Sequence, residues 1–251
     1  MSLFFLFNFF HHETNDKLEK GAVKIPKDPQ DWPEAWKRIE YKRYHLLKPV
    51  SLPQTSGVFF ESMLSKRRSS VEYFSDNKPA ASTLPMLSYV LRCGYGLQGC
   101  SKKESYRKEN RTVPSAGKRY PLEMYVFLFK PVDSLQTGIY HYGIQEHTLE
   151  PVVRREFTLE DRSSINPRKY LRGATGMICM TSVFERTTDK YGSRGYRYIL
   201  LEAGHVAQNM LLAGTEKCIN IIPIGGTNES VTERMMGLGT LDEKVVYTLF
   251  F

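Results

Sequence analysis

Uninterrupted runs of apolar residues predict the strands of the second half of the chain. Met124–Phe129 and Gly176–Val183 are typical of central strands that are covered on both faces of a sheet. Further strands are expected at Gly138–Gly143 and Thr148–Val153, paired as a hairpin, and at Cys218–Ile224 and Val245–Phe251.

The strongest helical pattern begins at Tyr196. Its apolar residues recur at the spacing of one helix face: Tyr196, Ile199, Leu200, Ala203, Val206, Ala207, Met210 and Leu211. The opposite side is largely apolar as well, which predicts a helix buried at the centre of a large domain or in a dimer interface. We interpret its polar stripe of Glu202, His205 and Asn209 as a hydrogen-bond network in such a setting.

Shorter helices are predicted from their end signals. Thr83 and Thr158 are expected N-caps, and two more helices are expected at Ser56–Leu64 and between Asn228 and Met236. Helices and strands are mixed without a regular βαβ repeat and without a Gly-x-Gly-x-x-Gly turn. These features favour an α+β fold over a Rossmann domain.

The first 56 residues differ from the rest in composition. Leu3–Phe10 is apolar but too short to cross a membrane, and it lacks the basic start and the cleavage site of a signal peptide. Residues 14–56 are polar and rich in proline, which predicts an extended arm with one short helix near Trp32–Tyr44. We therefore expect residues 1–56 to be an arm that docks on the body or on a partner subunit, and residues 57–251 to be the folded domain.

Charge and cysteines narrow the possible functions. The net charge is +8, but the basic residues are scattered, so a phosphate-bearing cofactor or an acidic peptide accounts for the charge as well as a nucleic acid does. The four cysteines lie at spacings that fit no metal site. Cys179 and Cys218 lie in apolar runs and are expected to be buried, reduced thiols of a cytoplasmic protein.

Two segments carry candidate binding chemistry. Pro114–Gly117 is a turn of small residues before a strand, and small side chains let a backbone come close to a flat or phosphorylated ligand. Arg67–Ser69 places two guanidinium groups beside a hydroxyl, an arrangement that matches phosphate oxygens. Taken alone, the first segment also fits a tight turn, and the second a solvated basic turn.

Several stretches together resemble the nitroreductase-like flavoproteins, and more closely the SagB-type dehydrogenases, which are azoline oxidases of ribosomal peptide biosynthesis. The matching stretches are Arg67–Ser69, Tyr95–Gly99, Arg111–Gly117, Tyr120–Glu123, Gly138–Tyr142, Lys190–Gly192, Arg194–Tyr198, Leu201–His205 and Pro223–Gly226. The resemblance covers nearly the whole chain. It implies a nitroreductase-like mixed β-sheet flanked by helices, with the long helix at a dimer interface.

The resemblance also implies an FMN-binding homodimer with the flavin held between subunits. The FMN phosphate and ribityl chain would be bound by Arg67, Arg68 and Ser69. The isoalloxazine ring would be lined by Pro114, Ser115, Ala116 and Gly117, and its N5 edge approached by Gly225 and Gly226. The chain departs from the family in having Val71 where a basic residue is usual, and in lacking a basic residue near its C-terminus. Phosphate binding would then use other cations, such as Arg186, Arg194 or Arg197, or flavin affinity would be weak.

Lys190 and Tyr191 match the catalytic Lys-Tyr pair of the azoline dehydrogenases. Oxidising a thiazoline or oxazoline to the azole requires a base for the carbon-bound proton, and either side chain could serve. The implied substrate is a modified peptide, presented alone or by a cyclodehydratase complex. Two alternatives remain open: an NAD(P)H-dependent nitro- or quinone-reductase, and a non-catalytic subunit of a peptide-modifying complex.

Overall fold

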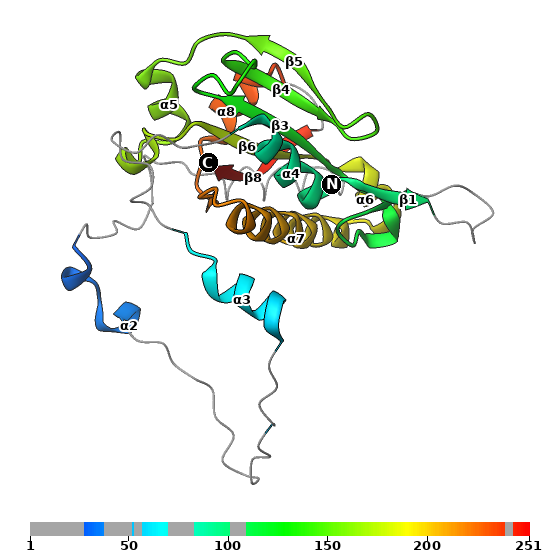
Figure 1. The fold of residues 1–251 in the computed structure, drawn as a ribbon. Coiled ribbons are helices and arrows are strands. Elements are labelled where there is room, and N and C mark those ends of the chain that lie inside the picture. The colour runs from blue at the N-terminus through cyan, green and yellow to red at the C-terminus, as the bar shows by residue number, and fades with distance from the viewer. Residues whose placement is uncertain (1–27, 38–51, 53–56, 70–82, 101–108, 239–242) are drawn as a thin grey trace.

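The sheet at the centre of the molecule has six strands in the order β5-β4-β3-β6-β8-β7 (Figure 1). A computed structural model describes residues 28–37, 52, 57–69, 83–100, 109–238 and 243–251. The strands are β3 (Leu122–Leu128), β4 (Gly138–Gly143), β5 (Thr148–Arg154), β6 (Gly176–Val183), β7 (Ile222–Ile224) and β8 (Glu243–Phe250). The central pair β3 and β6 is almost entirely buried, as its apolar runs predict.

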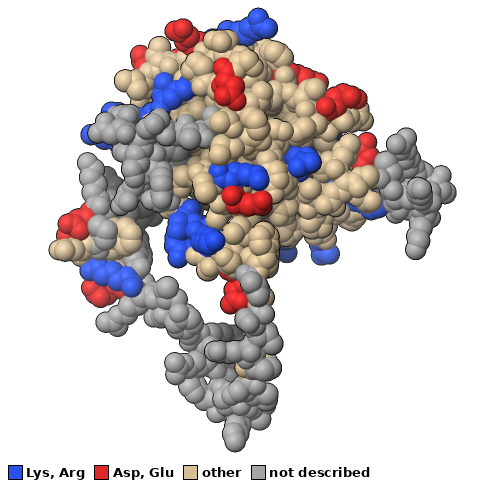
Figure 2. Space-filling model, in the orientation of Figure 1, with Lys and Arg blue, Asp and Glu red and all other residues tan. Residues whose placement is uncertain are grey.

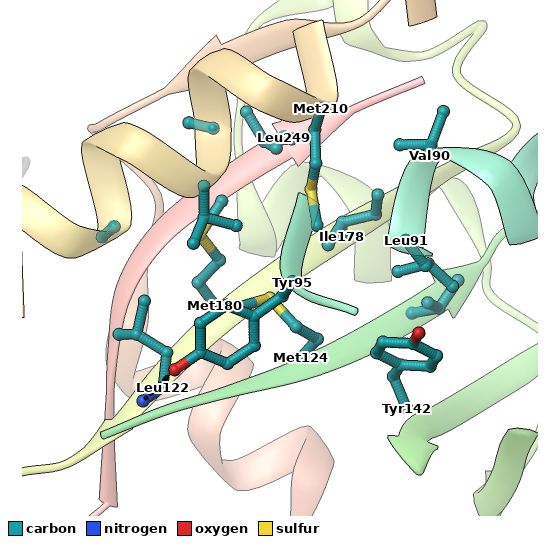
Figure 3. Packing of buried hydrophobic residues seen from close by; sticks show 14 of the residues in the cluster. Val90, Leu91, Tyr95, Leu122, Met124, Tyr142, Ile178, Met180, Met210 and Leu249 are labelled. Carbon is teal, nitrogen blue, oxygen red and sulfur yellow. Dashed lines mark hydrogen bonds between the residues drawn. The ribbon is translucent and has the colours of Figure 1, made fainter. Parts of the chain in front are cut away.

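Two helices cover one face of the sheet. They are α4 (Leu84–Tyr95) and the 23-residue α7 (Arg194–Glu216). Figure 3 shows side chains from both helices meeting the strands, with Met210 of α7 above Ile178 of β6 and Leu91 of α4 beside Tyr142 of β4. The helices themselves approach closely, because a Cβ atom placed on Gly94 would lie 2.5 Å from Met210 Cε.

Two shorter helices pack on the opposite face, α5 (Leu159–Ile165) and α8 (Glu229–Met236). The expected N-caps form: Thr83 accepts a hydrogen bond from Met86 N, Thr158 makes a capping box with Asp161, and Asn228 caps α8. The cap signals in the sequence therefore predicted the starts of α4, α5 and α8 correctly.

The remaining elements lie outside the sheet. A hairpin of β1 (Leu97–Cys100) and β2 (Glu109–Arg111) follows α4, and α6 (Glu185–Tyr191) joins β6 to α7. Towards the N-terminus lie a 3₁₀ turn at Pro29–Asp31, α2 (Glu34–Lys37) and α3 (Val58–Lys66), the last as expected. Two short 3₁₀ turns, Ala116–Lys118 and Lys169–Leu171, complete the set.

The expected α+β fold with a sheet flanked by helices and one long helix is confirmed, with three corrections. A mixed sheet was expected, but all described strand pairings in the sheet are antiparallel. Residues 109–111 form β2, a strand that the sequence patterns did not predict. Cys218 is exposed rather than buried, because the strand expected at Cys218–Ile224 forms only over Ile222–Ile224 and Cys218 lies in the connection after α7.

Three sequence expectations are not settled by these residues. Most of the proposed arm, including Leu3–Phe10, lies outside the described residues, as does Val71, and the division at residue 56 stays a prediction.

No helix within the described ranges is both long enough and apolar enough to cross a membrane. On the face drawn in Figure 2, basic and acidic side chains are interspersed rather than gathered in one basic patch.

Candidate functional site

The small-residue turn and the Lys-Tyr pair meet in space, although they lie far apart in the sequence. A Cβ atom placed on Gly117 would lie 2.5 Å from Tyr191 Oη and 2.9 Å from Lys190 Nζ. The backbone of Gly117 is left-handed (φ 59°), which favours glycine, and a larger residue there would also displace the ends of these two side chains. The site therefore has a bare backbone surface on one side and an ammonium and a phenol on the other.

The turn owes its shape to local bonds. Ser115 Oγ accepts a hydrogen bond from Tyr120 N at 2.9 Å, and Ser115 O accepts one from Lys118 N at 3.0 Å. Besides Gly117, Lys118 (φ 52°) and Tyr120 (φ 46°) are also left-handed. Three left-handed residues within four positions are costly for an L-chain, so the surroundings must hold this turn in place.

A buried carboxylate on α7 helps to hold it. Glu202 is only 3% exposed and accepts a hydrogen bond from Tyr95 Oη at 2.8 Å. Burial raises the pKa of Glu202, and hydrogen bonds from Ser115 and Tyr95 oppose this rise. The interpretation of the polar stripe as a hydrogen-bond network is thus confirmed for Glu202, and for Asn209, whose Nδ2 donates to the carbonyls of Cys93 and Thr112.

Arg111 is a residue of this site that the sequence analysis did not single out. Its guanidinium carbon lies 4.5 Å from the ring centroid of Tyr95 and 4.6 Å from that of Tyr120, so the cation sits between two aromatic rings. Its Nε and Nη1 are buried and have no hydrogen-bond partner among the described residues. The sequence signal that could have identified Arg111 is its position at the start of the matching stretch Arg111–Gly117.

The Lys-Tyr pair lies in the last turn of α6 rather than in a loop. The Lys190 ammonium lies 5.3 Å from the Tyr191 ring centroid, and the Tyr198 ring of α7 meets the Tyr191 ring edge-on at 5.2 Å. Gly192, with φ 56°, ends the helix directly afterwards. The phenol of Tyr191 and the amine of Lys190 thus lie side by side next to Gly117.

A charged cluster lies where α6 meets the sheet. Arg186 Nη1 lies 2.5 Å from Glu123 Oε1, and His141 lies between Glu123 and Glu150, with its two ring nitrogens 3.0 and 2.9 Å from their carboxylate oxygens. The bond to Glu123, followed by the bond to Glu150, raises the pKa of His141 to about 9 against the effect of burial. Burial would raise the pKa of Glu123, but the bonds from His141 and Arg186 outweigh it and lower that pKa.

The arginine pair lies elsewhere. Arg68 and Lys66 border an open pocket of about 380 Å³ that is also lined by Leu211 and Thr215 of α7 and by the segment from Cys218 to Ile221. Arg67 Nη1 donates to Ser69 Oγ at 3.2 Å. The two cations that border the pocket, Lys66 and Arg68, could hold an anionic phosphate group.

Gly225 and Gly226 follow β7, close in sequence to this pocket. A Cβ atom on Gly225 would meet nothing within 4 Å, so the backbone there is open to a ligand. The carbonyl of Gly226 accepts hydrogen bonds from Asn166 Nδ2 at 2.7 Å and from Arg168 Nη1 at 3.0 Å, which fix the peptide. An open yet anchored backbone suits the edge of a planar ring.

The candidate residues form two groups along α7. The pocket of Arg68 lies against Leu211, whereas the Gly117 turn meets α7 at Glu202, which accepts a hydrogen bond from Ser115. At 1.5 Å per residue, Glu202 and Leu211 are about 14 Å apart along the helix axis. Within one chain, the structure does not bring the arginine pair to the turn.

Comparisons with known proteins identify the family. The nitroreductase family model matches residues 65–251. The chain is 33% identical over 176 residues to MJ1384 of Methanocaldococcus jannaschii, a protein provisionally named a nitroreductase, and this match covers 70% of the chain and 83% of that protein.

Two further relatives are named for peptide processing. The microcin B17-processing protein McbC of Escherichia coli is 28% identical over 154 residues, which cover 55% of this chain and 52% of that protein. The trifolitoxin-processing protein TfxB of Rhizobium leguminosarum is 27% identical over 140 residues, covering 54% and 38% respectively. The matches thus span about half of McbC and less of TfxB.

A solved structure shares the fold of nearly the whole chain. It is a chain of the E. coli microcin synthetase McbBCD complex with truncated pro-MccB17 bound, with a TM-score of 0.76 at 20% identity, and the match covers 99% of this chain and 92% of that one. The resemblance drawn from the sequence motifs is confirmed by these matches. The chain belongs to the nitroreductase family.

Proposed function

We propose that this protein is an FMN-dependent dehydrogenase that oxidises thiazoline or oxazoline rings to azoles in a ribosomally made peptide. The observation that carries the proposal is the position of Lys190 Nζ and Tyr191 Oη directly against the left-handed Gly117. The similarity to McbC and TfxB, both named for the processing of peptides, supports a peptide substrate.

The residues present fit FMN in two parts. Arg67, Arg68 and Ser69 would hold the phosphate at the open pocket, and the exposed backbone of Gly225 beside the anchored Gly226 would lie along the ring edge. Pro114, Ser115, Ala116 and Gly117 would line the other side of the ring. When bound, FMN accepts the electrons that the azoline loses.

In the proposed homodimer, a second subunit supplies one of these two parts. A homodimer with two antiparallel α7 helices would bring the arginine pair of one subunit to the Gly117 turn of its partner. Leu200 and Leu201 on α7 support this arrangement, because they are 40% and 55% exposed in the single chain. The expected homodimer is therefore part of the proposal.

The protein's own chemical task is to remove a proton. As the azoline becomes an azole, one ring carbon would lose a proton to Lys190 Nζ or to Tyr191 Oη, while the neighbouring ring carbon would give up a hydrogen together with two electrons. The helical geometry of α6 holds both atoms at the turn.

The experiment is turnover of a synthetic peptide that carries one thiazoline, followed by the mass loss of two hydrogens. Lys190→Ala and Tyr191→Phe should each lower kcat by about a hundredfold or more, as loss of a general base does. Lys217→Ala is the matched control, because the Lys217 ammonium also lies over a tyrosine ring, 4.3 Å from that of Tyr89. Wild-type rates in both Lys190→Ala and Tyr191→Phe would refute the proposed chemistry.

A second candidate is an NAD(P)H-dependent nitro- or quinone-reductase, which the 33% identity to MJ1384 favours. Fast reduction of the bound flavin by NADH or NADPH, with turnover of a nitroaromatic and none of the thiazoline peptide, would select it. Purified protein that lacks flavin absorbance and takes up no added FMN would instead favour a non-catalytic subunit of a peptide-modifying complex.

A further inference from the structure

Arg186 lies in the first turn of α6 and forms hydrogen bonds through its side chain and through its backbone carbonyl. Its guanidinium group pairs with Glu123 of β3, and the same Nη1 lies 3.5 Å from the carbonyl oxygen of Tyr120. Its own backbone carbonyl accepts a hydrogen bond from Arg119 Nε. Arg119 and Tyr120 end the small-residue turn, so one residue links that turn, the sheet and α6.

The second carboxylate oxygen of Glu123, Oε2, is bonded to His141. His141 Nε2 lies 3.0 Å from Glu123 Oε2, and His141 Nδ1 lies 2.9 Å from Glu150 Oε2. Since both ring nitrogens face carboxylates, both must donate, and the ring is an imidazolium. The raised pKa of His141, about 9, agrees with this geometry. The Glu123 carboxylate is therefore fixed between two cations.

The position of Arg186 determines the position of the Lys-Tyr pair. α6 has only seven residues, and Lys190 follows Arg186 by four positions, which places the two side chains on the same face of the helix. Tyr191 is the next residue. Because a Cβ atom on Gly117 would lie within 3 Å of both Tyr191 Oη and Lys190 Nζ, a small shift of α6 changes the distance between the pair and the turn.

We propose that Arg186 is a positioning residue, held by Glu123 and His141, that sets the approach of Lys190 and Tyr191 to the Gly117 turn. The proposal rests on the proposed function, because it assigns the pair its role in catalysis. It also removes Arg186 from the cations that could bind the FMN phosphate. Its charge is already paired with Glu123.

The test compares two substitutions of Arg186 with a matched ion pair elsewhere. Arg186→Met removes the cation, and Arg186→Lys retains a cation that can reach Glu123 but lacks the fork for Tyr120 O as well. Arg155→Met is the control, since Arg155 pairs with Asp161 at 2.8 Å on the far side of the sheet with similar exposure. Glu123→Gln is a second variant that removes only the charge.

Two measurements are made on the full-length, flavin-loaded protein. The first is kcat and KM with the thiazoline peptide. The second is backbone amide exchange in residues 115–120 and 187–192, which needs no substrate. A misplacement of about 1 Å can cost about a hundredfold in rate. We therefore expect Arg186→Met to lower kcat at least about tenfold, with KM and flavin content within about twofold of wild type.

The conservative variants add a graded response. Arg186→Lys should recover most of the lost kcat, Glu123→Gln should fall between Arg186→Met and wild type, and Arg155→Met should match wild type. Exchange should quicken in both segments in Arg186→Met, and in neither in Arg155→Met.

The outcomes separate failure of this proposal from failure of the proposed function. If wild-type protein does not oxidise the peptide, the function fails, and the exchange data alone still decide whether Arg186 joins the two segments. Unchanged exchange in both segments, or a kcat of Arg186→Met within about twofold of wild type, would overturn the positioning role. Equal losses in Arg186→Met and Arg155→Met would do the same, because they would reflect stability only.

Discussion

At the scale of single residues, the site depends on the backbone of Gly117. Gly117 combines a left-handed backbone with two side chains in the space that a Cβ atom would occupy. The sequence predicted that Pro114–Gly117 approaches something closely. It could not show that Lys190 and Tyr191 lie on the other side, because contacts between distant segments leave no periodic pattern in a single sequence.

The two constraints at Gly117 can be separated by mutation. Gly237 is also left-handed (φ 77°), but a Cβ atom there would meet nothing within 4 Å. Gly117→Ala and Gly237→Ala should each cost about 1–2 kcal/mol of stability through backbone strain, measured by chemical denaturation. Only Gly117→Ala should also lower kcat with the thiazoline peptide, because its methyl group displaces Tyr191. Equal activity in the two variants would argue against a role for this contact.

At the scale of elements, periodic or uniformly apolar patterns were read correctly and short polar elements were missed. The bounds of β6 coincide with the predicted run Gly176–Val183, because nearly every residue in it is buried. α6 was not predicted, since Glu185–Tyr191 is polar and too short to show an apolar face. β1 and β2 were missed for a similar reason, because their sequences, LQGC and ENR, include few apolar residues.

His141 provides a pH-dependent link among β3, β4 and β5. Its raised pKa, about 9, means that the folded state binds a proton more tightly than the unfolded chain does, where histidine titrates near about 6.5. The stabilisation is fully present below about pH 6.5 and is lost as the pH rises through about 9. The neighbouring groups do not reverse this sign, because burial keeps Tyr125 neutral and Arg186 stays charged.

The prediction is that His141→Gln lowers Tm most near pH 6, and by much less near pH 10. The measurement is thermal unfolding of wild type and variant in matched buffers across that range. Arg155→Met breaks an ion pair that contains no histidine, so its deficit should be the same at both ends. A His141→Gln deficit that does not shrink with rising pH would contradict the charged state assigned to this residue.

At the scale of the whole molecule, the arrangement of elements divides the proposed cofactor site into two. α7 separates the pocket of Arg68 from the Gly117 turn, and its exposed side carries Leu200, Leu201 and Gly204. The sequence predicted a helix that is apolar on both sides and left two explanations open. One side packs on the sheet, and the other side is exposed in the single chain, where the proposed homodimer would cover it.

This division predicts that dimerisation and flavin binding are lost together. Leu201→Glu puts a charge on the exposed side of α7, where burial in an interface would cost several kcal/mol. We expect a monomer by light scattering with little bound flavin by absorbance, because neither half of the site then has its complement. Leu159→Glu is the matched control, since Leu159 is 61% exposed on α5, at the opposite face of the sheet. A Leu201→Glu monomer that retains flavin would show that one chain holds the cofactor alone. A wild-type protein that is monomeric and fully loaded would show the same, and the arginine pair and the Gly117 turn would then have to serve different ligands.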